Sequence, residues 1–263
     1  MADELPDIQA VRDGRNIAIQ KVGVRNVRRP IAVLDRAKGV QHTIGTFSLL
    51  VDLPHSFKGT HMSRFIEVLN EYKEEFGIES LSPLLAALRE RLKADTAYVE
   101  IRFPYFMAKR APVSRKEGLM EYECAFVASQ SGPSSATDFA FSLEARVPVT
   151  TLCPCSKEIS DRGAHNQRGI VTARVHCDSS LWLEEVIEVV ESCASCGLYP
   201  LLKRPDEKWV TEHAYDNPRF VEDVVREVAL AFDREPRVHA YEVEVENEES
   251  IHAHNAYAFV SRG

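Results

Sequence analysis

The strongest constraint on the fold is one order of predicted elements that occurs twice along the 263-residue chain. In each half, two strand-like segments precede two amphipathic helices, and two more strand-like segments follow. The repeat is one of organisation and not of amino-acid identity. The strands are predicted at 17–27, 42–53, 96–103 and 119–128 in the first half, and at 137–149, 169–177, 238–245 and 251–260 in the second.

Apolar residues at helical spacing predict the two helices of each half. In the first half, one stripe runs from Met62 to Tyr72, and a second helix starts near Ser82. In the second half, one helix covers about 181–195 and another opens at Pro218. This order predicts an α+β fold in which antiparallel sheet carries helix pairs on one face. The sheet has free edges, which favours pairing into an oligomeric barrel.

A polar segment rich in Ser, Gly and Pro, at 129–136, separates the two halves. We therefore expect a flexible leader at 1–16, a first module at 17–135 and a second module at 136–263. The leader is acidic and polar, unlike an export signal, and no apolar run approaches the roughly 20 residues of a membrane-spanning helix. These features predict a cytoplasmic protein. The formal charge of −8 argues against nucleic acid or an anionic membrane as a partner.

The most informative segment for chemistry is TTLCPCSKEISDRGAHNQRG, at 150–169. Cys153 and Cys155 flank one proline, whose fixed φ stiffens the backbone between them. A short helical turn that stops at Gly163 is expected to bring His165 to the cysteines. A thiolate and an imidazole are suitable ligands for a borderline-soft divalent metal. The alternative is that both cysteines are small buried core residues.

The second candidate cluster is EESIHAHNAYA, at 248–258. Strand alternation predicts that His252 and His254 share one face. One imidazole can then ligate a metal while the other transfers protons near neutral pH. The alternative is two histidines on a solvated strand face. Together with Cys153 and His165, this cluster supplies the three protein ligands of a catalytic metal site with an open position.

A charged segment at 201–227 contributes further polar candidates. Its first part is predicted to be a long polar connection, in which Lys203 could neutralise phosphate; a solvated loop is the competing interpretation. Glu222 stands at the edge of an apolar helix stripe, where its carboxylate can accept two hydrogen bonds from a guanine edge. It equally suits a first-turn glutamate that complements the helix dipole.

Cys193 and Cys196 form a C-x-x-C motif at a helix end. A four-cysteine structural zinc site with Cys153 and Cys155 is disfavoured, because Cys193 falls on the apolar stripe of its helix. A redox pair would stand at a helix N-terminus, where the dipole lowers the thiol pKa, whereas this pair is at a C-terminus.

These segments resemble one enzyme family. TTLCPCSKEIS with HNQRG, LLKRPDEK, NPRFVEDVVR, ESIHAHNAYA and GTFSLLVDLPHSFKGTHMSRF occur in order and are similar to segments of the type IB GTP cyclohydrolases. The resemblance implies a tunnelling fold with two ββααββ modules per subunit, joined into barrels as a homotetramer with shared active sites. It also implies conversion of GTP to 7,8-dihydroneopterin 3'-triphosphate and formate, the first step of folate biosynthesis.

The resemblance also implies roles for individual residues. Cys153 matches the metal thiolate, while His165, Glu207 and His252 match positions that complete or border the metal site. Glu222 matches the carboxylate that anchors the purine. We expect His254 to transfer protons and Cys155 to lie beside the ligands. The candidate contacts to the triphosphate are basic residues: Lys109, Arg110, Arg168 and Lys203.

One divalent metal is expected in each site, and the mixed S, N and O ligands suit Mn²⁺, Zn²⁺ or Fe²⁺. Two other functions compete with the cyclohydrolase. A tunnelling-fold nitrile reductase acting on a deazapurine would use a cysteine nucleophile and a nicotinamide cofactor, but the number of candidate ligands favours a metal. A non-catalytic purine- or pterin-binding scaffold would unfold when its metal is removed, whereas a catalytic site would lose activity with the fold intact.

Overall fold

The computed structural model describes residues 8–9, 11–72, 75–132, 138–177 and 181–263. The chain divides into two compact units, Met1–Phe103 with Ala125–Phe141 and Pro104–Cys124 with Ser142–Gly263. We call them unit 1 and unit 2. This division differs from the expected linear modules at 17–135 and 136–263, because three long strands contribute residues to both units. The predicted linker at 129–136 lies partly outside the described residues.

Unit 1 is built on strands β1 (Ile19–Asp35), β2 (Gly39–Leu53) and β3 (Glu75–Phe76), beside parts of β4 (Ala97–Arg110), β5 (Glu117–Ser131) and β6 (Asp138–Leu152). The strand order is β6-β5-β4-β2-β1-β3. β1, β2 and β4 are antiparallel neighbours, whereas the two-residue strand β3 pairs with β1 in parallel. The antiparallel strands agree with the prediction, and β3 is an addition too short to show a periodicity.

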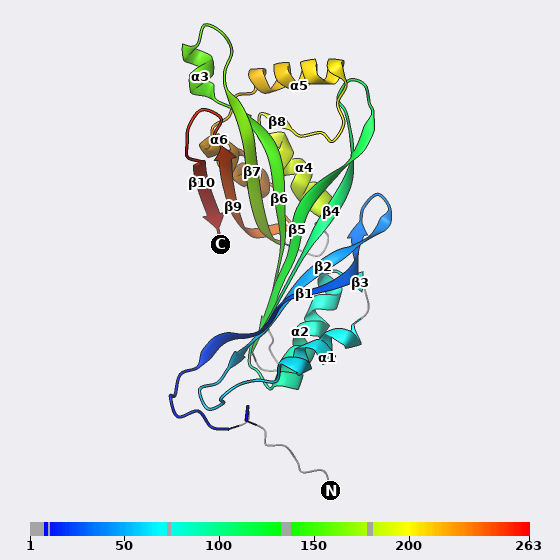
Figure 1. The fold of residues 1–263 in the computed structure, drawn as a ribbon, viewed down its shortest axis with the longest axis vertical. Helices are drawn as coiled ribbons and strands as arrows, with labels where there is room; N and C mark the ends of the chain where they lie inside the picture. Colours follow the sequence, from blue (N-terminus) through cyan, green and yellow to red (C-terminus); the bar gives the residue numbers. More distant parts are fainter. Residues whose placement is uncertain (1–7, 10, 73–74, 133–137, 178–180) are drawn as a thin grey trace. The chain divides into compact units, whose positions relative to one another are not determined.

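Two helices complete unit 1, α1 (Met62–Glu71) and α2 (Ile78–Leu92), and they pack on each other and on β1 and β2 (Figure 1). Most residues of their apolar stripes are buried, which confirms the periodicity, although Met62 at the start of the first stripe is exposed. The buried set includes Phe65, Leu69, Leu81, Leu85 and Leu88. The prediction that the second helix starts near Ser82 is wrong. The helix starts one turn earlier, at Ile78, where the Ser80 hydroxyl accepts the Gly77 N–H at 3.1 Å and satisfies the N-cap backbone.

Unit 2 contains β7 (Asn166–Cys177), β8 (Cys196–Gly197), β9 (Val238–Glu248) and β10 (Ala256–Arg262), beside the rest of β4, β5 and β6. The strand order is β10-β9-β7-β6-β5-β4, and β8 pairs with β6 (Figure 1). Helices α4 (Leu183–Cys193) and α6 (Val221–Asp233) pack against each other, α4 on β7 and α6 on β9 and β10. The helix pair on an antiparallel sheet confirms the α+β prediction for this half.

Two predictions of secondary structure in unit 2 are wrong. The segment after Leu201 was expected to be a polar connection, but it contains a 13-residue helix, α5 (Arg204–Asp216). A proline in the first turn and the Asp206 carboxylate, which accepts the Lys203 N–H, favour the start of that helix. The strand predicted at 251–260 begins later, at Ala256, so the preceding histidines lie in a loop. Among the described residues, no helix is long and apolar enough to cross a membrane.

Candidate active site

Cys153 and His165 lie at the two ends of the connection between β6 and β7. Because these strands are antiparallel and Leu152 pairs with Asn166, the residues next to that pair must meet. The Cys153 N–H donates to the His165 carbonyl at 3.1 Å. Cys153 also caps α3 (Pro154–Ile159), where its Sγ accepts the Ser156 N–H at 3.4 Å. The backbones of Cys153 and His165 are therefore adjacent, as the sequence predicted.

The side chain of His165 belongs to a short chain of hydrogen bonds. Its Nδ1 is 2.9 Å from Gln167 Oε1, and Gln167 Nε2 donates to the Thr151 hydroxyl at 2.9 Å. Since the amide nitrogen donates to Thr151, the amide oxygen faces Nδ1 and accepts a hydrogen bond from a proton carried there. That tautomer leaves the Nε2 lone pair of His165 available for a metal or a proton.

Gln167 is a residue that the motif analysis missed. It is 8% exposed, and Thr151 is fully buried. A glutamine at a buried position of a strand is unusual, and this is the signal in the sequence that could have identified it. The same strand passes close to β9 at Gly169, where a Cβ atom would stand 2.6 Å from Asn247 Oδ1.

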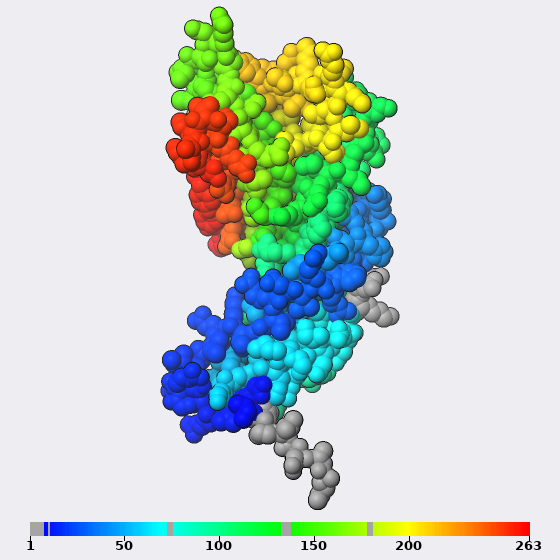
Figure 2. Space-filling model, viewed as in Figure 1, coloured from blue at the N-terminus to red at the C-terminus, as the bar shows by residue number. Residues whose placement is uncertain are grey.

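His252 and His254 lie on the exposed loop between β9 and β10. Their rings stack with centroids 5.2 Å apart and planes at 20°, so the two side chains are together although no strand holds them. Ser250 in the same loop has its hydroxyl 3.4 Å from His165 Nδ1. The loop that carries both histidines therefore meets the loop that carries Cys153 and His165. Figure 2 shows this C-terminal segment, in red, on the surface of unit 2.

The predicted metal ligands are Cys153, His165, Glu207 and His252. Within the described part of the chain, no group of three or more His, Cys, Asp or Glu residues is close enough to hold a metal ion. The half-buried Cys153 thiol and the free His165 nitrogen fit a borderline-soft divalent ion in kind. Glu207 is exposed in the first turn of α5, and His252 is exposed in its loop.

Helix α5 is fixed at its start by the fully buried carboxylate of Asp206. Asp206 accepts the backbone N–H groups of Lys203, Val113 and Ser114, each at 2.8 Å, and the Ser114 hydroxyl at 2.6 Å. Burial raises the pKa of Asp206, but these hydrogen bonds lower the pKa by more. The net result is a pKa well below the usual value of an aspartate, so the carboxyl group is ionised at neutral pH. The anchor determines where Lys203 and Glu207 stand.

The other end of α5 is bonded to α3. Lys157 on α3 donates to the Tyr215 carbonyl at 2.5 Å, and its ammonium stands 4.3 Å from the centre of the Tyr215 ring. Both helices therefore lie at the same end of unit 2, as Figure 1 shows. The segment before α6 is joined to the same region, since the Arg219 N–H donates to the carbonyl of Leu152, next to Cys153. Glu222, exposed in the first turn of α6, follows three residues later.

The four basic candidates differ in their surroundings. Lys109 forms an ion pair with Glu191 at 2.6 Å, and Glu191 also accepts the Tyr122 hydroxyl at 2.8 Å. Arg110 pairs with Glu117 at 3.0 Å on the surface. Arg168 on β7 and Lys203 before α5 are both exposed. The ammonium of Lys109 is thus bound to a carboxylate inside unit 2, whereas the side chains of Arg168 and Lys203 are exposed to solvent.

All six cysteines are free thiols, and four of them are buried. Burial raises the pKa of Cys196 to about 11 and raises that of Cys193 as well. Both groups are therefore protonated at neutral pH, which agrees with the argument against a redox C-x-x-C. Cys155 is exposed, next to the half-buried Cys153.

Solved structures define the class of fold. The chain superposes on a uricase from Bacillus fastidious with a TM-score of 0.59 at 8% identity, covering 92% of each chain. Urate oxidase from Bacillus subtilis 168 gives a TM-score of 0.52 at 10% identity, with 92% of this chain and 97% of that chain covered. The protein therefore has the tandem α+β tunnelling architecture of these proteins.

The family is defined by sequence. The profile described as Type I GTP cyclohydrolase folE2 matches residues 5–258. The GTP cyclohydrolase FolE2 of Aromatoleum aromaticum is 53% identical over 259 residues, which cover 98% of this chain and 94% of the relative. That of Azoarcus sp. is 52% identical over 262 residues, or 100% and 96% of the two chains. The chain belongs to the FolE2 family of type I GTP cyclohydrolases, as its motifs indicated.

Proposed function

We propose that this protein converts GTP to 7,8-dihydroneopterin 3'-triphosphate and formate, the reaction that begins folate biosynthesis, at a site centred on Cys153 and His165. The observation that carries the proposal is the meeting of these residues at the end of the β6–β7 pair, in a chain that belongs to this family. The reaction opens the imidazole ring of guanine, so it needs an activated water and groups that move protons.

Cys153 and His165 would hold one divalent metal, either Mn²⁺, Zn²⁺ or Fe²⁺, with Glu207 and His252 as further ligands. When bound, such an ion lowers the pKa of a water toward neutrality. Gln167 supports this role, because it holds the Nδ1 proton of His165 and leaves Nε2 free. Cys155, two residues away and exposed, would lie beside the ligands without binding.

The remaining residues would bind the substrate and move protons. His254, which stacks on His252, would protonate a ring nitrogen as the bond to C8 breaks. Glu222 would accept the guanine N–H groups, and its exposure on the first turn of α6 leaves both oxygens available. Arg168 and Lys203 are the better candidates for the triphosphate, because Lys109 and Arg110 already have carboxylate partners.

We further propose a homotetramer with sites shared between subunits. β10 ends the strand order of unit 2, and it exposes Tyr257 and Phe259 at 59% and 52%. An edge strand with an exposed apolar face is suited to pairing with another copy. Ligands from a neighbouring copy would also explain why three donors do not meet within the described part of one chain.

The test compares two neighbouring cysteines. Cys153→Ser should abolish formate release from GTP and lower the metal content per subunit, whereas Cys155→Ser should retain both. Circular dichroism confirms that both variants fold. If folded Cys153→Ser released formate from GTP as fast as Cys155→Ser and the unaltered protein, the assignment of Cys153 would be refuted. A reductase would instead depend on a nicotinamide cofactor, and the family match argues against it.

A further inference from the structure

The ladder between β6 and β7 ends at the backbone that carries Cys153 and His165. The last β6 residue of the ladder is Leu152. Its N–H donates to the Ser195 hydroxyl at 3.0 Å, and its carbonyl accepts the Arg219 N–H at 3.0 Å, so both groups point away from β7. Because these directions alternate along an antiparallel strand, the next residue, Cys153, directs its N–H and its carbonyl towards His165.

Only one of the two hydrogen bonds of such a pair is direct. The Cys153 N–H donates to the His165 carbonyl at 3.1 Å. The other connection passes through Ser156: the His165 N–H donates to the Ser156 hydroxyl at 3.2 Å, and that hydroxyl donates to the Cys153 carbonyl at 3.1 Å. A single hydroxyl therefore replaces the last bond of the ladder and satisfies both backbone groups.

The inserted hydroxyl sets the spacing of the two residues. In a regular strand pair, a direct bond holds the amide nitrogen and the carbonyl oxygen about 2.9–3.0 Å apart. Two successive contacts through Ser156 take the place of that bond, so the pair is wider here than a closed ladder. Ser156 also contacts the Cys153 side chain, because its N–H donates to Cys153 Sγ at 3.4 Å and fixes the direction of the sulfur.

The spacing matters because opposite residues of a strand pair project their side chains to the same face. A zinc ion binds a thiolate sulfur at about 2.3 Å and an imidazole nitrogen at about 2.0–2.1 Å. The separation of the Cys153 and His165 backbones therefore decides whether both side chains can reach one ion. Ser156 is half-buried, as both ligands are, so water competes only in part for its hydroxyl.

We propose that Ser156 is a positioning residue of the metal site, whose hydroxyl holds Cys153 and His165 at the separation at which both bind one divalent ion. This inference rests on the proposed function and adds a residue that touches neither metal nor substrate. Its task differs from that of Gln167, which orients the imidazole ring of His165. Without the hydroxyl, the His165 N–H and the Cys153 carbonyl bond directly or through water, and the spacing changes.

The test compares Ser156→Ala with Ser156→Thr, which keeps the hydroxyl. Zn²⁺ affinity is measured by competition with a chromophoric chelator. Ser156→Ala should bind Zn²⁺ about ten-fold more weakly, at the low end for partners of metal ligands, because the hydroxyl holds backbone and not ligand atoms. Ser156→Thr should restore most of the affinity. The matched control is Ser160→Ala, since the Ser160 hydroxyl accepts the Arg162 N–H at 3.1 Å in the same connection, and its affinity should not change.

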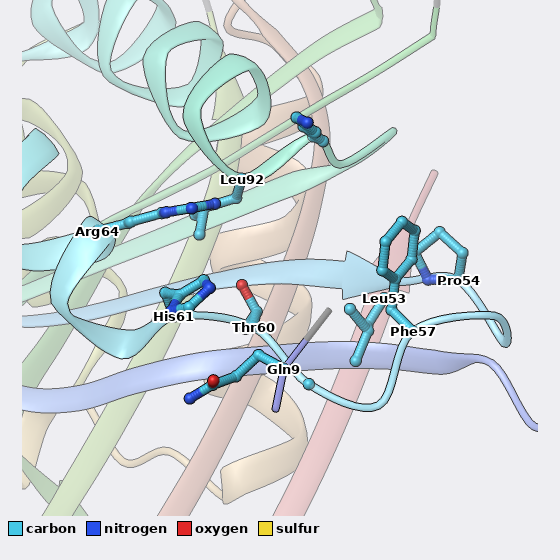
Figure 3. Close-up of a pocket in the computed structure, with 10 residues that line it drawn as sticks. Gln9, Leu53, Pro54, Phe57, Thr60, His61, Arg64 and Leu92 are labelled. Atoms are coloured by element: carbon cyan, nitrogen blue, oxygen red, sulfur yellow. The ribbon is translucent and has the colours of Figure 1, made fainter. Parts of the chain in front are cut away.

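A second metal site in the chain would complicate this titration. The cavity of about 140 Å³ in unit 1 is lined by one possible ligand, His61, beside the cations Arg64 and Lys93, and no cysteine or carboxylate is among its lining residues (Figure 3). Two positive charges disfavour a cation there. We therefore expect the titration to report the site in unit 2.

Cobalt distinguishes positioning from a general loss of stability. At saturating Co²⁺, the charge-transfer band of the thiolate–metal bond should shift or weaken in folded Ser156→Ala and stay unchanged in Ser160→Ala. If Ser156→Ala matched the unaltered protein in Zn²⁺ affinity and in the Co²⁺ spectrum, the positioning role would be overturned and the metal site would stand. Absence of metal binding by the unaltered protein would instead refute the proposed metal site, and this inference with it.

Discussion

Replacement of Gln167 by methionine tests the proposed support of His165. Methionine has a similar length but cannot hydrogen-bond as the amide does, so the contacts to Thr151 and to His165 are both lost. The fully buried Thr151 hydroxyl then loses the hydrogen bond from Gln167, which should lower the free energy of unfolding by about 1–3 kcal/mol. His165 is half-buried, and water can replace its lost contact at little cost.

The expected loss of stability corresponds to a fall in Tm of about 2–4 °C for each kcal/mol in a chain of this size. The functional effect should be larger. Residues that orient a metal-binding histidine typically contribute about 10–100-fold to metal affinity or activity. Gln167→Met should therefore lower Zn²⁺ affinity, measured by competition with a chromophoric chelator, and formate release from GTP by factors in that range.

The matched control is Gln130→Met. Gln130 is 5% exposed in unit 1, and its amide donates to the Ser82 hydroxyl at 3.3 Å. This variant should lose a similar or smaller amount of stability and keep both metal affinity and turnover. If folded Gln167→Met binds metal and releases formate as the unaltered protein does, the proposed orientation of His165 is wrong.

Three further predictions concern stability and are measured by urea or thermal unfolding. Lys109→Met should lower the free energy of unfolding by about 1–3 kcal/mol, because it removes the cation from the part-buried carboxylate of Glu191; an unchanged value would contradict the ion pair. Leu85→Ala removes a fully buried side chain of α2 and should cost about 2–5 kcal/mol, and a loss below 1 kcal/mol would mean that the α1–α2 packing is wrong. Hydrogen bonding to Arg237 lowers the pKa of Glu235 from 4.5 to about 2. The folded-state pKa is depressed, so this contribution is present above pH 4.5 and is lost as the pH falls towards 2; Arg237→Gln should flatten Tm against pH in that window, and an unaltered acid limb would count against the pair.

The spacing of apolar residues was sufficient to predict many of the helices and strands, because that spacing depends only on neighbours within the same element. The stripes of α1, α4 and α6 and the alternation of the long strands show directly which face is buried. Helix α5 could not be found in this way. Within it only Asp206 and Ala214 are buried, so it has no apolar stripe, and a single buried carboxylate bonded to residues 113 and 114 holds it in place. That contact joins residues about 90 positions apart.

The same distinction holds for the site. Cys153 and His165 were predictable as neighbours because a strand pair separated by a short connection must bring its ends together. The strand argument for His252 and His254 was wrong, since the ladder with β9 starts at Ala256, although the rings still stack. Glu207 depends on the placement of α5, and its role as a ligand stays a prediction. Each of β4, β5 and β6 has one end in unit 1 and the other end in unit 2, and no change of composition along the sequence indicates these division points.

The most direct test of the central claim is turnover of GTP by protein that has been stripped with a chelator and then supplied separately with Mn²⁺ or Zn²⁺. Formate and the fluorescent oxidised pterin are measured together. The account predicts that both products appear in equal amounts when metal is restored, and that Cys153→Ala and His165→Ala abolish them. No formate with either metal, from protein that circular dichroism shows to be folded, would contradict it.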